Sequence, residues 1–355
     1  MTGGPTPPAA PPSTAATAPT ASAAPPAGSL VLVTGATGFT GGELARRLVA
    51  AGCRVRALVR ASSDRTALER LGVEIVPGNV YDPDAARAAC AGVEYVFHVA
   101  AAYREAGIDD GVYRQVHVAS TELLARAAQA SGRLRRFVHV STVGVHGHID
   151  EPPADESARF SPGDVYQDTK AEGELRVREL AAGEGVPVTV VRPAAIFGPG
   201  DLRLLKVFKL ARLPVVPLIG RTRGLYHLIH VADLCRFMMA AAVAPEAEGE
   251  VYICANAEPT SIREMVLEAA RLLGTRPRFV RVPAAPVFAL ARAVERVSKA
   301  ASVEPPLYPR RVAFFTKDRA FDSRKMRALP GYELEFDNAT GIRDAVDWYR
   351  KHGKL

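Results

Sequence analysis

The residues Leu-Val-Leu-Val-Thr-Gly-Ala-Thr-Gly-Phe-Thr-Gly-Gly, Leu30 to Gly42, indicate the architecture of this 355-residue chain. An apolar, β-branched run gives way to spaced glycines, and a helical pattern follows. A strand, a tight glycine turn and a helix form the geometry that holds the pyrophosphate of a dinucleotide. Gly35 would permit the turn, Gly38 would let the backbone approach the phosphates, and Gly41 would let the helix pack close to the strand. The alternative is an ordinary strand–helix turn that is rich in glycine.

Strand and helix patterns alternate over the following 150 or so residues. We expect strands at 54–60, 73–76, 95–100, 136–140 and 186–191, and helices at 120–129 and 166–180. Strands separated by helices favour a parallel sheet that is covered on both faces. The predicted fold class is therefore α/β, a Rossmann-type doubly wound parallel sheet with a smaller C-terminal lobe that binds the substrate.

Three segments are predicted along the chain. Residues 1–29 are Ala, Pro, Thr, Ser and Gly apart from Met1, so they can bury little and should form a disordered tail. Residues 30–195 would form the NAD(P)-binding domain. Residues 196–355 would form the substrate lobe, except that 225–243 would return to the sheet.

Composition excludes several classes of protein. The net charge is +7, but the arginines are scattered and no basic stripe is interleaved with aromatics, which argues against nucleic-acid binding. No 18-residue apolar run is present, so we expect no transmembrane segment. The four cysteines are far apart and lack metal-ligand spacing, so we expect neither a metal site nor disulfides. Reduced thiols without a secretion signal favour the cytoplasm.

Tyr166 and Lys170 are four residues apart in a helical pattern, so both side chains should lie on one face. Ser161 and Pro162 would supply the cap and first-turn proline of that helix. A tyrosine that acts as an acid or base near neutral pH needs its pKa lowered by roughly three units, about 4 kcal/mol. A neighbouring ammonium group would favour the phenolate. The alternative is a commonplace surface pair.

Ser141 and Thr142 follow the strand expected at 136–140. A hydroxyl at the carboxyl end of a parallel strand could hydrogen-bond a substrate oxygen beside the phenol. A Ser–Thr pair in this position is also a common turn cap. The pair alone therefore leaves both interpretations open.

Five motifs together occur in the order and spacing of the extended short-chain dehydrogenase/reductases. They are the glycine-rich stretch, His98-Val99-Ala100-Ala101, Ser141-Thr142, Tyr166 with Lys170, and Arg192-Pro193-Ala-Ala-Ile-Phe-Gly-Pro-Gly. From Leu30 to its end the chain resembles that superfamily. The resemblance implies that Tyr166 is the general acid/base, that Thr142 orients the substrate oxygen and that Ser141 is a supporting hydroxyl. It implies that Lys170 binds the nicotinamide ribose and lowers the Tyr166 pKa.

The resemblance also implies a set of cofactor-binding residues. They are Gly35, Thr37, Gly38, Phe39, Thr40, Gly41, Arg60, Asn79, Val80, Val99, Ala100, Ala101, Lys170, Pro193 and Ile196. Sites that prefer NAD place an acidic residue at the end of the second strand, where this chain has Arg60. Because an arginine can pair with a 2′-phosphate, we expect NADP in preference to NAD. Asn79 replaces the usual aspartate beside the adenine, and its amide can make the same contact.

The substrate positions depart from those of similar nucleotide-sugar enzymes. Ala195 and Tyr226 occupy the places where those enzymes use an asparagine and an arginine to hold a sugar diphosphate. Such a pocket would be uncharged and partly apolar, which disfavours a diphosphate. The C-terminal part looks more like the branch related to 3β-hydroxysteroid dehydrogenases. The expected substrate residues are Tyr103, Thr142, Tyr166, Ala195 and Tyr226.

The predicted function is NAD(P)-dependent interconversion of a secondary alcohol and a ketone on a bulky, apolar, sterol- or lipid-like substrate. Two alternatives stay open: a nucleotide-sugar epimerase or dehydratase that uses arginines such as Arg203, and a non-catalytic NADP-sensing protein. By resemblance we expect a homodimer that pairs through the helix bearing Tyr166. Residues 287–297 form an amphipathic, basic helix, which would wall the substrate pocket or make a weak membrane-surface contact.

Overall fold

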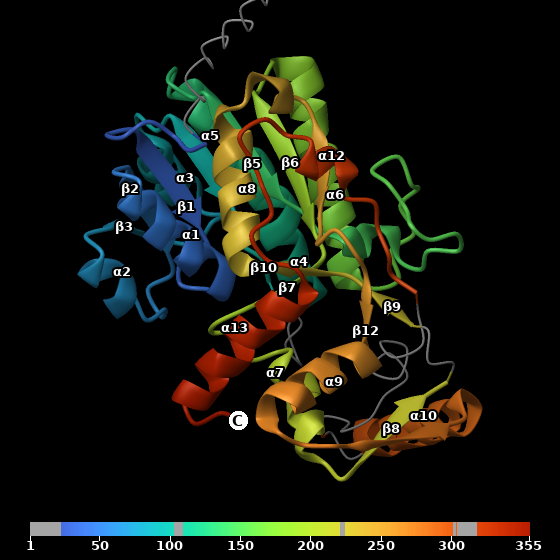
Figure 1. Ribbon diagram of the computed structural model, residues 1–355. Coiled ribbons are helices and arrows are strands. Elements are labelled where there is room, and N and C mark those ends of the chain that lie inside the picture. The colour runs from blue at the N-terminus through green and yellow to red at the C-terminus, as the bar shows by residue number, and fades with distance from the viewer. Residues whose placement is uncertain (1–22, 103–108, 221–223, 301–302, 304–317) are drawn as a thin grey trace, which may run out of the picture.

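A computed structural model describes residues 23–102, 109–220, 224–300, 303 and 318–355. A parallel sheet of seven strands forms the centre of the larger part, in the order β3-β2-β1-β4-β5-β6-β11 (Figure 1). The strands are β1 (Leu30–Thr34), β2 (Arg54–Val59), β3 (Glu74–Pro77), β4 (Tyr95–His98), β5 (Arg136–Val140), β6 (Val188–Pro193) and β11 (Val251–Cys254). The order reverses between β1 and β4, where ligands bind in doubly wound sheets.

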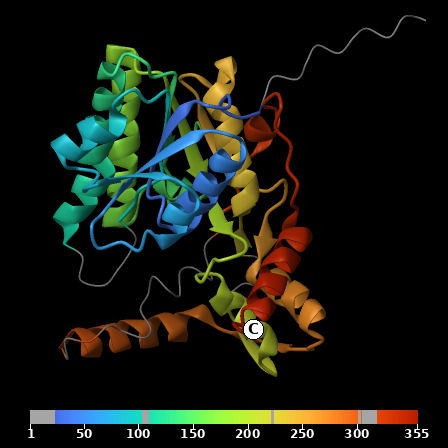
Figure 2. The same ribbon diagram turned by 90° about the vertical axis from the view of Figure 1, so that its left-hand side faces the viewer.

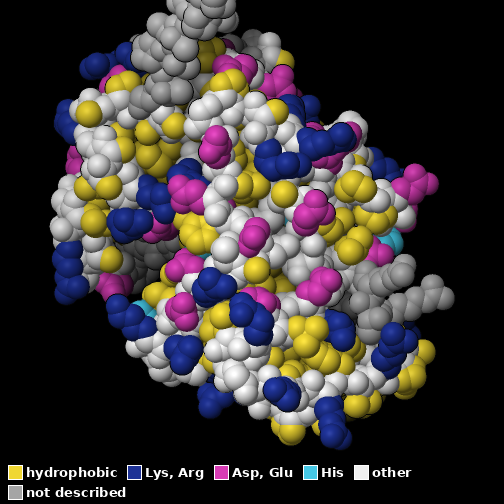
Figure 3. Space-filling view, viewed as in Figure 1, with side chains coloured by type: hydrophobic (Ala, Val, Ile, Leu, Met, Phe, Trp, Pro, Cys, Tyr) yellow, Lys and Arg dark blue, Asp and Glu magenta, His cyan; other side chains and the backbone are white. Residues whose placement is uncertain are grey.

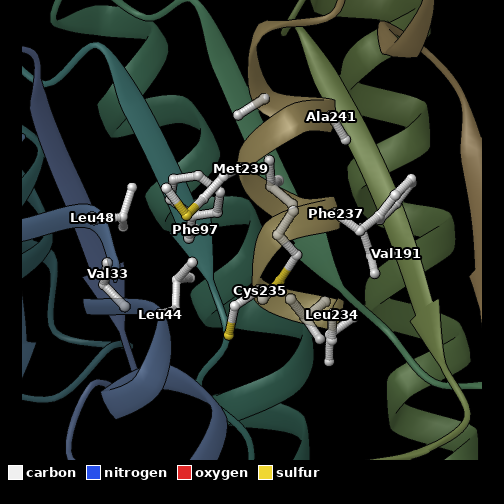
Figure 4. Packing of buried hydrophobic residues seen from close by; sticks show 14 of the residues in the cluster. Val33, Leu44, Leu48, Phe97, Val191, Leu234, Cys235, Phe237, Met239 and Ala241 are labelled. Atoms are coloured by element: carbon white, nitrogen blue, oxygen red, sulfur yellow. The ribbon is translucent and has the colours of Figure 1, made fainter. Parts of the chain in front are cut away.

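Helices cover both faces of the sheet, as the buried strands require. On one face lie α1 (Phe39–Ala50) and α8 (Val231–Val243), and on the other lie α3 (Pro83–Cys90), α5 (Ser120–Ala130) and α6 (Val165–Glu184). Figure 4 shows the first layer, in which Leu44 and Leu48 of α1, Phe97 of β4 and Leu234 of α8 belong to one cluster of buried side chains. The predicted Rossmann-type doubly wound sheet is confirmed.

A smaller lobe lies below the sheet in Figure 1. Its elements are β7 (Ala195–Phe197), α7 (Leu205–Lys209), β8 (Val215–Ile219), β9 (Leu225–Tyr226), β10 (Leu228–His230), β12 (Thr260–Ser261), α9 (Ile262–Leu273), β13 (Arg278–Val282), α10 (Ala284–Ala300) and α13 (Asn338–Lys351). The strands pair as β7 with β10, β8 with β13, and β9 with β12. Phe208, Met265 and Tyr349 share the core of this lobe.

The remaining elements are short. They are α2 (Thr66–Arg70), α4 (Asp110–Arg114), α12 (Arg324–Arg327), a π-helical turn (Gln115–Ala119) and 3-10 turns at Val143–His146, Leu210–Arg212 and Pro245–Ala247. Among the described helices, none is both long and apolar enough to cross a bilayer.

Three local expectations differ from the structure. Residues 1–22 of the expected tail lie outside the described part, but Ala24 packs against the core and the Gly28 N–H donates to Gly52 O at 2.8 Å, so order begins before Leu30. The helix bearing Tyr166 is capped by Asp164, whose carboxylate accepts from the Gln167 N–H, and not by Ser161. Residues 225–243 return to the main sheet only through α8, which covers one of its faces, because β9 pairs with β12 and β10 pairs with β7. The strand at the edge of the main sheet is β11, which the sequence did not predict.

Candidate active site

The turn between β1 and α1 is a close-packed glycine cradle. Gly35 has φ +69°, and a Cβ there would lie 2.9 Å from Ala100 Cα. A Cβ on Gly41 would lie 2.2 Å from Gly35 O, so neither position accepts a side chain. Gly38 caps α1 without a side-chain acceptor, and the first turn of α1 holds no acidic residue. The N–H groups and the positive end of the helix dipole therefore suit an anionic group.

The other predicted cofactor residues lie at the same carboxyl edge of the sheet. Val99 to Ala101 follow β4, and the Ala100 N–H donates to Thr34 Oγ1 at 3.1 Å. Arg60 follows β2 and is exposed, while Asn79 and Val80 follow β3 and are half-buried. This arrangement fits a dinucleotide that extends from the cradle along the ends of the strands.

A cavity of about 610 Å³ opens next to this edge. Many of the residues predicted for the cofactor and substrate line it: Thr40, Val99, Ala101, Ser141, Thr142, Tyr166, Lys170, Pro193, Ala195, Ile196 and Tyr226. Gly35, Thr37, Gly38, Phe39, Gly41, Arg60, Asn79, Val80 and Ala100 are not in its lining. Tyr103 lies outside the described residues.

Lys170 is buried at the floor of the cavity, 3% exposed. Its Nζ donates to Val140 O, the last residue of β5, at 2.6 Å. Burial lowers the pKa of the ammonium to about 8, although nearby Glu174 acts in the opposite direction. The ammonium is therefore charged at neutral pH in a poorly solvated place, where it acts strongly on neighbouring groups.

His117 connects Tyr166 to the loop after β4, a contact that the sequence did not predict. Its ring lies edge-on to the Tyr166 ring, with centroids 5.3 Å apart. His117 Nε2 accepts from the Ala102 N–H at 3.0 Å, so Nδ1 carries the proton and donates to Thr169 Oγ1 at 2.8 Å. Burial lowers the pKa of His117 to about 2, so the ring stays neutral.

The two hydroxyls after β5 differ in their contacts. Thr142 Oγ1 accepts from the Gly144 N–H at 3.0 Å and so caps the 3-10 turn, which leaves the hydroxyl hydrogen outside this bond. The Ser141 hydroxyl is buried and has no hydrogen-bond partner among the described residues. An unpaired buried hydroxyl that lines a cavity fits a site that receives a polar ligand.

Arg192, the residue before Pro193, is buried behind the cavity. Its Nη2 donates to Glu174 Oε1 of α6 at 2.5 Å, and both side chains are fully buried. Nη1 also donates to His146 Nε2 at 3.2 Å and to Glu156 O at 2.9 Å. This network joins β6 to the helix that carries Tyr166 and Lys170.

The lobe supplies the remaining wall. Tyr226 forms a β-bridge with Arg319, and the Phe321 N–H donates to His227 Nδ1 at 3.1 Å, so the segment 319–321 lies against the cavity. No local pattern predicted Arg319 or Phe321 as cavity residues, because both lie more than 90 residues from Tyr226 and His227, which they contact.

Two expectations about the cavity are corrected by its lining. The expectation of an uncharged pocket is wrong, because Arg203, Lys206 and Arg319 line it. Of the described residues of α10, none lines the cavity, so this helix does not wall it. Of these three cations, the sequence analysis named only Arg203, as a residue that a nucleotide-sugar enzyme could use.

Comparisons with known proteins agree with this geometry. A family model described as the NAD dependent epimerase/dehydratase family matches residues 31–255. The chain is 31% identical to sterol demethylase protein B of Methylococcus capsulatus, over 91% of this chain and 99% of the relative. It is 30% identical to the 3β-hydroxysteroid dehydrogenase/Δ5→4-isomerase of Mycobacterium tuberculosis, over 90% of each. The crystal structure of gox2253 superposes with a TM-score of 0.76 at 28% identity, covering 92% of this chain and 99% of that one.

Proposed function

Since the chain belongs to the NAD dependent epimerase/dehydratase family, within the extended short-chain dehydrogenase/reductases, we propose that it interconverts a secondary alcohol and a ketone. The proposed substrate is bulky and largely apolar, of the sterol or lipid class. The observation that supports this most directly is the shared cavity, which is lined by Thr142, Tyr166 and Lys170 and also by the apolar residues Leu204 and Phe321.

The residues of the chain would divide the chemistry as follows. Tyr166 would give its phenolic proton to the ketone oxygen in reduction and take it back in oxidation. The Thr142 hydroxyl would hydrogen-bond the same oxygen and hold it in line, while the Lys170 ammonium would stabilise the phenolate. A nicotinamide cofactor held by the glycine cradle would supply or accept the hydride.

The test of Tyr166 is the variant Tyr166→Phe. General acid–base catalysis contributes about 100-fold to 10,000-fold, so kcat should fall by at least about 100-fold while the Kd for cofactor stays within about twofold. Tyr252→Phe is the matched control, because the Tyr252 hydroxyl donates to Glu246 O at a long 3.5 Å and Tyr252 does not line the cavity. If Tyr166→Phe keeps the wild-type turnover, Tyr166 is not the general acid/base and the proposal is contradicted.

The proposed substrate class is supported by the apolar residues of the cavity and by the names of two relatives, one a sterol demethylase protein and the other a 3β-hydroxysteroid dehydrogenase/isomerase. Hydroxysteroids and long-chain secondary alcohols or ketones should raise the melting temperature in the presence of cofactor, since a ligand that binds the native state stabilises it. Oxidation or reduction of those that protect should then be followed through nicotinamide absorbance.

A second candidate, a nucleotide-sugar epimerase or dehydratase, is favoured by the three cations in the cavity. Arg203 is partly engaged, because its Nε donates to Asp201 Oδ1 at 2.8 Å and its Nη2 to Ile196 O at 2.9 Å. A panel of UDP- and dTDP-sugars separates the two functions. Protection by these sugars, without protection by steroids or long-chain ketones, would contradict the first proposal and support the second.

We also propose a preference for NADP. The support is Arg60, a cation that is exposed at the end of β2, where it could pair with a 2′-phosphate. Arg60→Asp should lower the NADP-to-NAD ratio of kcat/KM by about 10-fold to 100-fold, the range that a charge-assisted hydrogen bond supplies. Arg54→Asp is the control, since Arg54 is exposed at the opposite end of the same strand. An unchanged ratio in Arg60→Asp would contradict the preference.

A further inference from the structure

Three elements of the smaller lobe, α10, β8 and β13, carry between them exposed apolar side chains and exposed arginines. We call the exposed side chains of these three elements the lobe face. Its exposed large apolar side chains are Val215 (48% exposed), Val280 (50%), Leu290 (57%) and Val297 (68%). Figure 3 shows hydrophobic side chains at the lower right, in the region of β8, with Lys and Arg side chains among them.

The helix α10 has an outward stripe of apolar residues. Pro286, Leu290, Ala293 and Val297 are all exposed and recur at helical spacing, whereas Ala291 and Ser298 on the other side are buried. Arg292 and Arg296 lie next to this stripe, one turn apart, and are exposed. An apolar stripe flanked by arginines is the pattern of a helix that lies in the plane of a membrane interface.

The charge of the chain is concentrated in this lobe. Residues 202–219 and 276–298 contain nine Lys or Arg and one Glu, a net charge of +8, whereas the whole chain carries +7. Within these ranges β8 lies beside β13, with Val215 opposite Arg278 and Pro217 opposite Val280, and α10 follows β13 directly along the chain. The rest of the molecule therefore carries a net charge of −1, and an anionic surface would attract this face specifically.

The position of α10 leaves its apolar stripe available for contact with a surface outside the molecule. In Figure 2 it extends along the lower edge of the molecule, away from α7 and α9. Of its described residues none lines the cavity, so substrate binding does not account for its apolar stripe. A second copy of the chain would bring like charges together, which costs energy at an interface.

We propose that the lobe face docks on an anionic lipid bilayer, with Leu290 and Val297 inserted among the acyl chains and Arg292 and Arg296 paired with headgroups. The cavity opens beside the same basic lobe, because Lys206 and Val207 of α7 line it. Docking would therefore hold the cavity close to the bilayer. The proposal does not rest on the proposed reaction, because binding to vesicles is measured without turnover.

The test is co-sedimentation of the full chain with vesicles of phosphatidylcholine alone and of phosphatidylcholine with phosphatidylglycerol. We expect binding to the anionic vesicles that weakens at high salt, and little binding to the neutral ones. Each basic residue near an anionic membrane strengthens binding about fivefold, so the double variant Arg292→Gln with Arg296→Gln should bind about 25-fold more weakly. The double variant Leu290→Glu with Val297→Glu should bind the anionic vesicles at least about tenfold more weakly than the wild type.

Leu267→Glu is the control, since Leu267 is exposed on α9 outside the lobe face. All the substituted side chains are exposed, so the variants should keep the wild-type circular dichroism spectrum. Wild-type binding in both double variants, or no binding to either vesicle, would overturn the proposal. Two other results would also overturn the proposal. One is that the chain forms a dimer and that the Leu290 and Val297 substitutions dissociate it. The other is that the chain binds RNA and that this binding depends only on Arg292 and Arg296.

Discussion

Lys170 is the residue whose charge state should control the pH dependence of activity. Burial lowers its pKa to about 8, so the ammonium is present below pH 8 and is lost as the pH rises through that value. If the ammonium stabilises the Tyr166 phenolate, kcat/KM should fall above about pH 8, approaching tenfold per pH unit. The measurement is a pH profile of kcat/KM with saturating cofactor.

Lys170→Arg is the control for that profile, since a guanidinium does not lose its proton in this range. This variant should be less active, because the arginine must fit a buried site, but its remaining activity should lack the fall near pH 8. A fall that persists in Lys170→Arg would assign the titration to another group and contradict the prediction.

At the scale of single residues, the sequence predicted which residues belong to the site better than it predicted their contacts. The spacing of Tyr166 and Lys170 predicted one helix face, and the structure adds that Lys170 is buried against Val140 O. Thr142 is a turn cap as well as a cavity residue, so the two interpretations of the Ser–Thr pair do not exclude each other. His117 gave no signal, because its contacts depend on a π-helical turn that no local pattern predicts.

Among the elements, α6 depends on a close approach to that π-helical turn. A Cβ on Gly173 of α6 would lie 2.1 Å from His117 O. Gly173→Ala must therefore push the turn away from α6, shifting His117 relative to Tyr166. We expect a loss of about 1 to 3 kcal/mol in the free energy of unfolding, as for overpacked sites, and a lower kcat. Urea unfolding and steady-state kinetics measure the two effects.

The same helix offers a matched control for Gly173. Gly183 lies in the last turn of α6, and a Cβ there would meet nothing within 4 Å. Gly183→Ala should leave kcat unchanged and raise the free energy of unfolding by about 0.5 to 1 kcal/mol, since alanine favours the helix. Equal effects of the two substitutions would show that the contact with His117 O has no consequence.

Element boundaries were predicted well where the local sequence pattern is strong and poorly where contacts with distant residues determine them. The strand expected at 136–140 matches β5, and the helix patterns at 120–129 and 166–180 match α5 and α6 within a few residues. β11 is only four residues long and acquires its role by pairing with β6, some 60 residues earlier. Such pairing is set by tertiary contacts, which a local pattern does not contain.

At the scale of the whole molecule, the sequence predicted which strands converge but not which parts of the lobe meet them. Parallel strands share a carboxyl edge, so the glycine turn and the residues after β4, β5 and β6 had to lie close together. The lobe is assembled from segments that are far apart in sequence, and Arg319 and Phe321 are held at the cavity by contacts with distant residues such as Ala154, Tyr226 and His227. The charge of the cavity could not be deduced without that assembly.

Buried neutral histidines should make the whole fold sensitive to acid. Burial lowers the pKa of His98 to about 3, of His117 to about 2 and of His227 to about 4, and lowers that of His139 well below its ordinary value. Below pH 6.5 the unfolded chain takes up protons that the folded chain does not, so stability is lost as the pH falls. Each of these four histidines should cost about 0.8 kcal/mol between pH 7.5 and 6.0, about 3 kcal/mol together. His146 and His230 add to this loss, because burial also lowers the pKa of each.

Urea unfolding at pH 7.5 and 6.0 measures this loss, and two variants locate it. His139 is buried with neither ring nitrogen hydrogen-bonded among the described residues, so His139→Leu should reduce the loss by about 0.8 kcal/mol. His148 is exposed, so His148→Gln should leave the loss unchanged. A free energy of unfolding that is equal or higher at pH 6.0 would contradict the prediction, because it would mean that the folded chain takes up these protons as readily as the unfolded one.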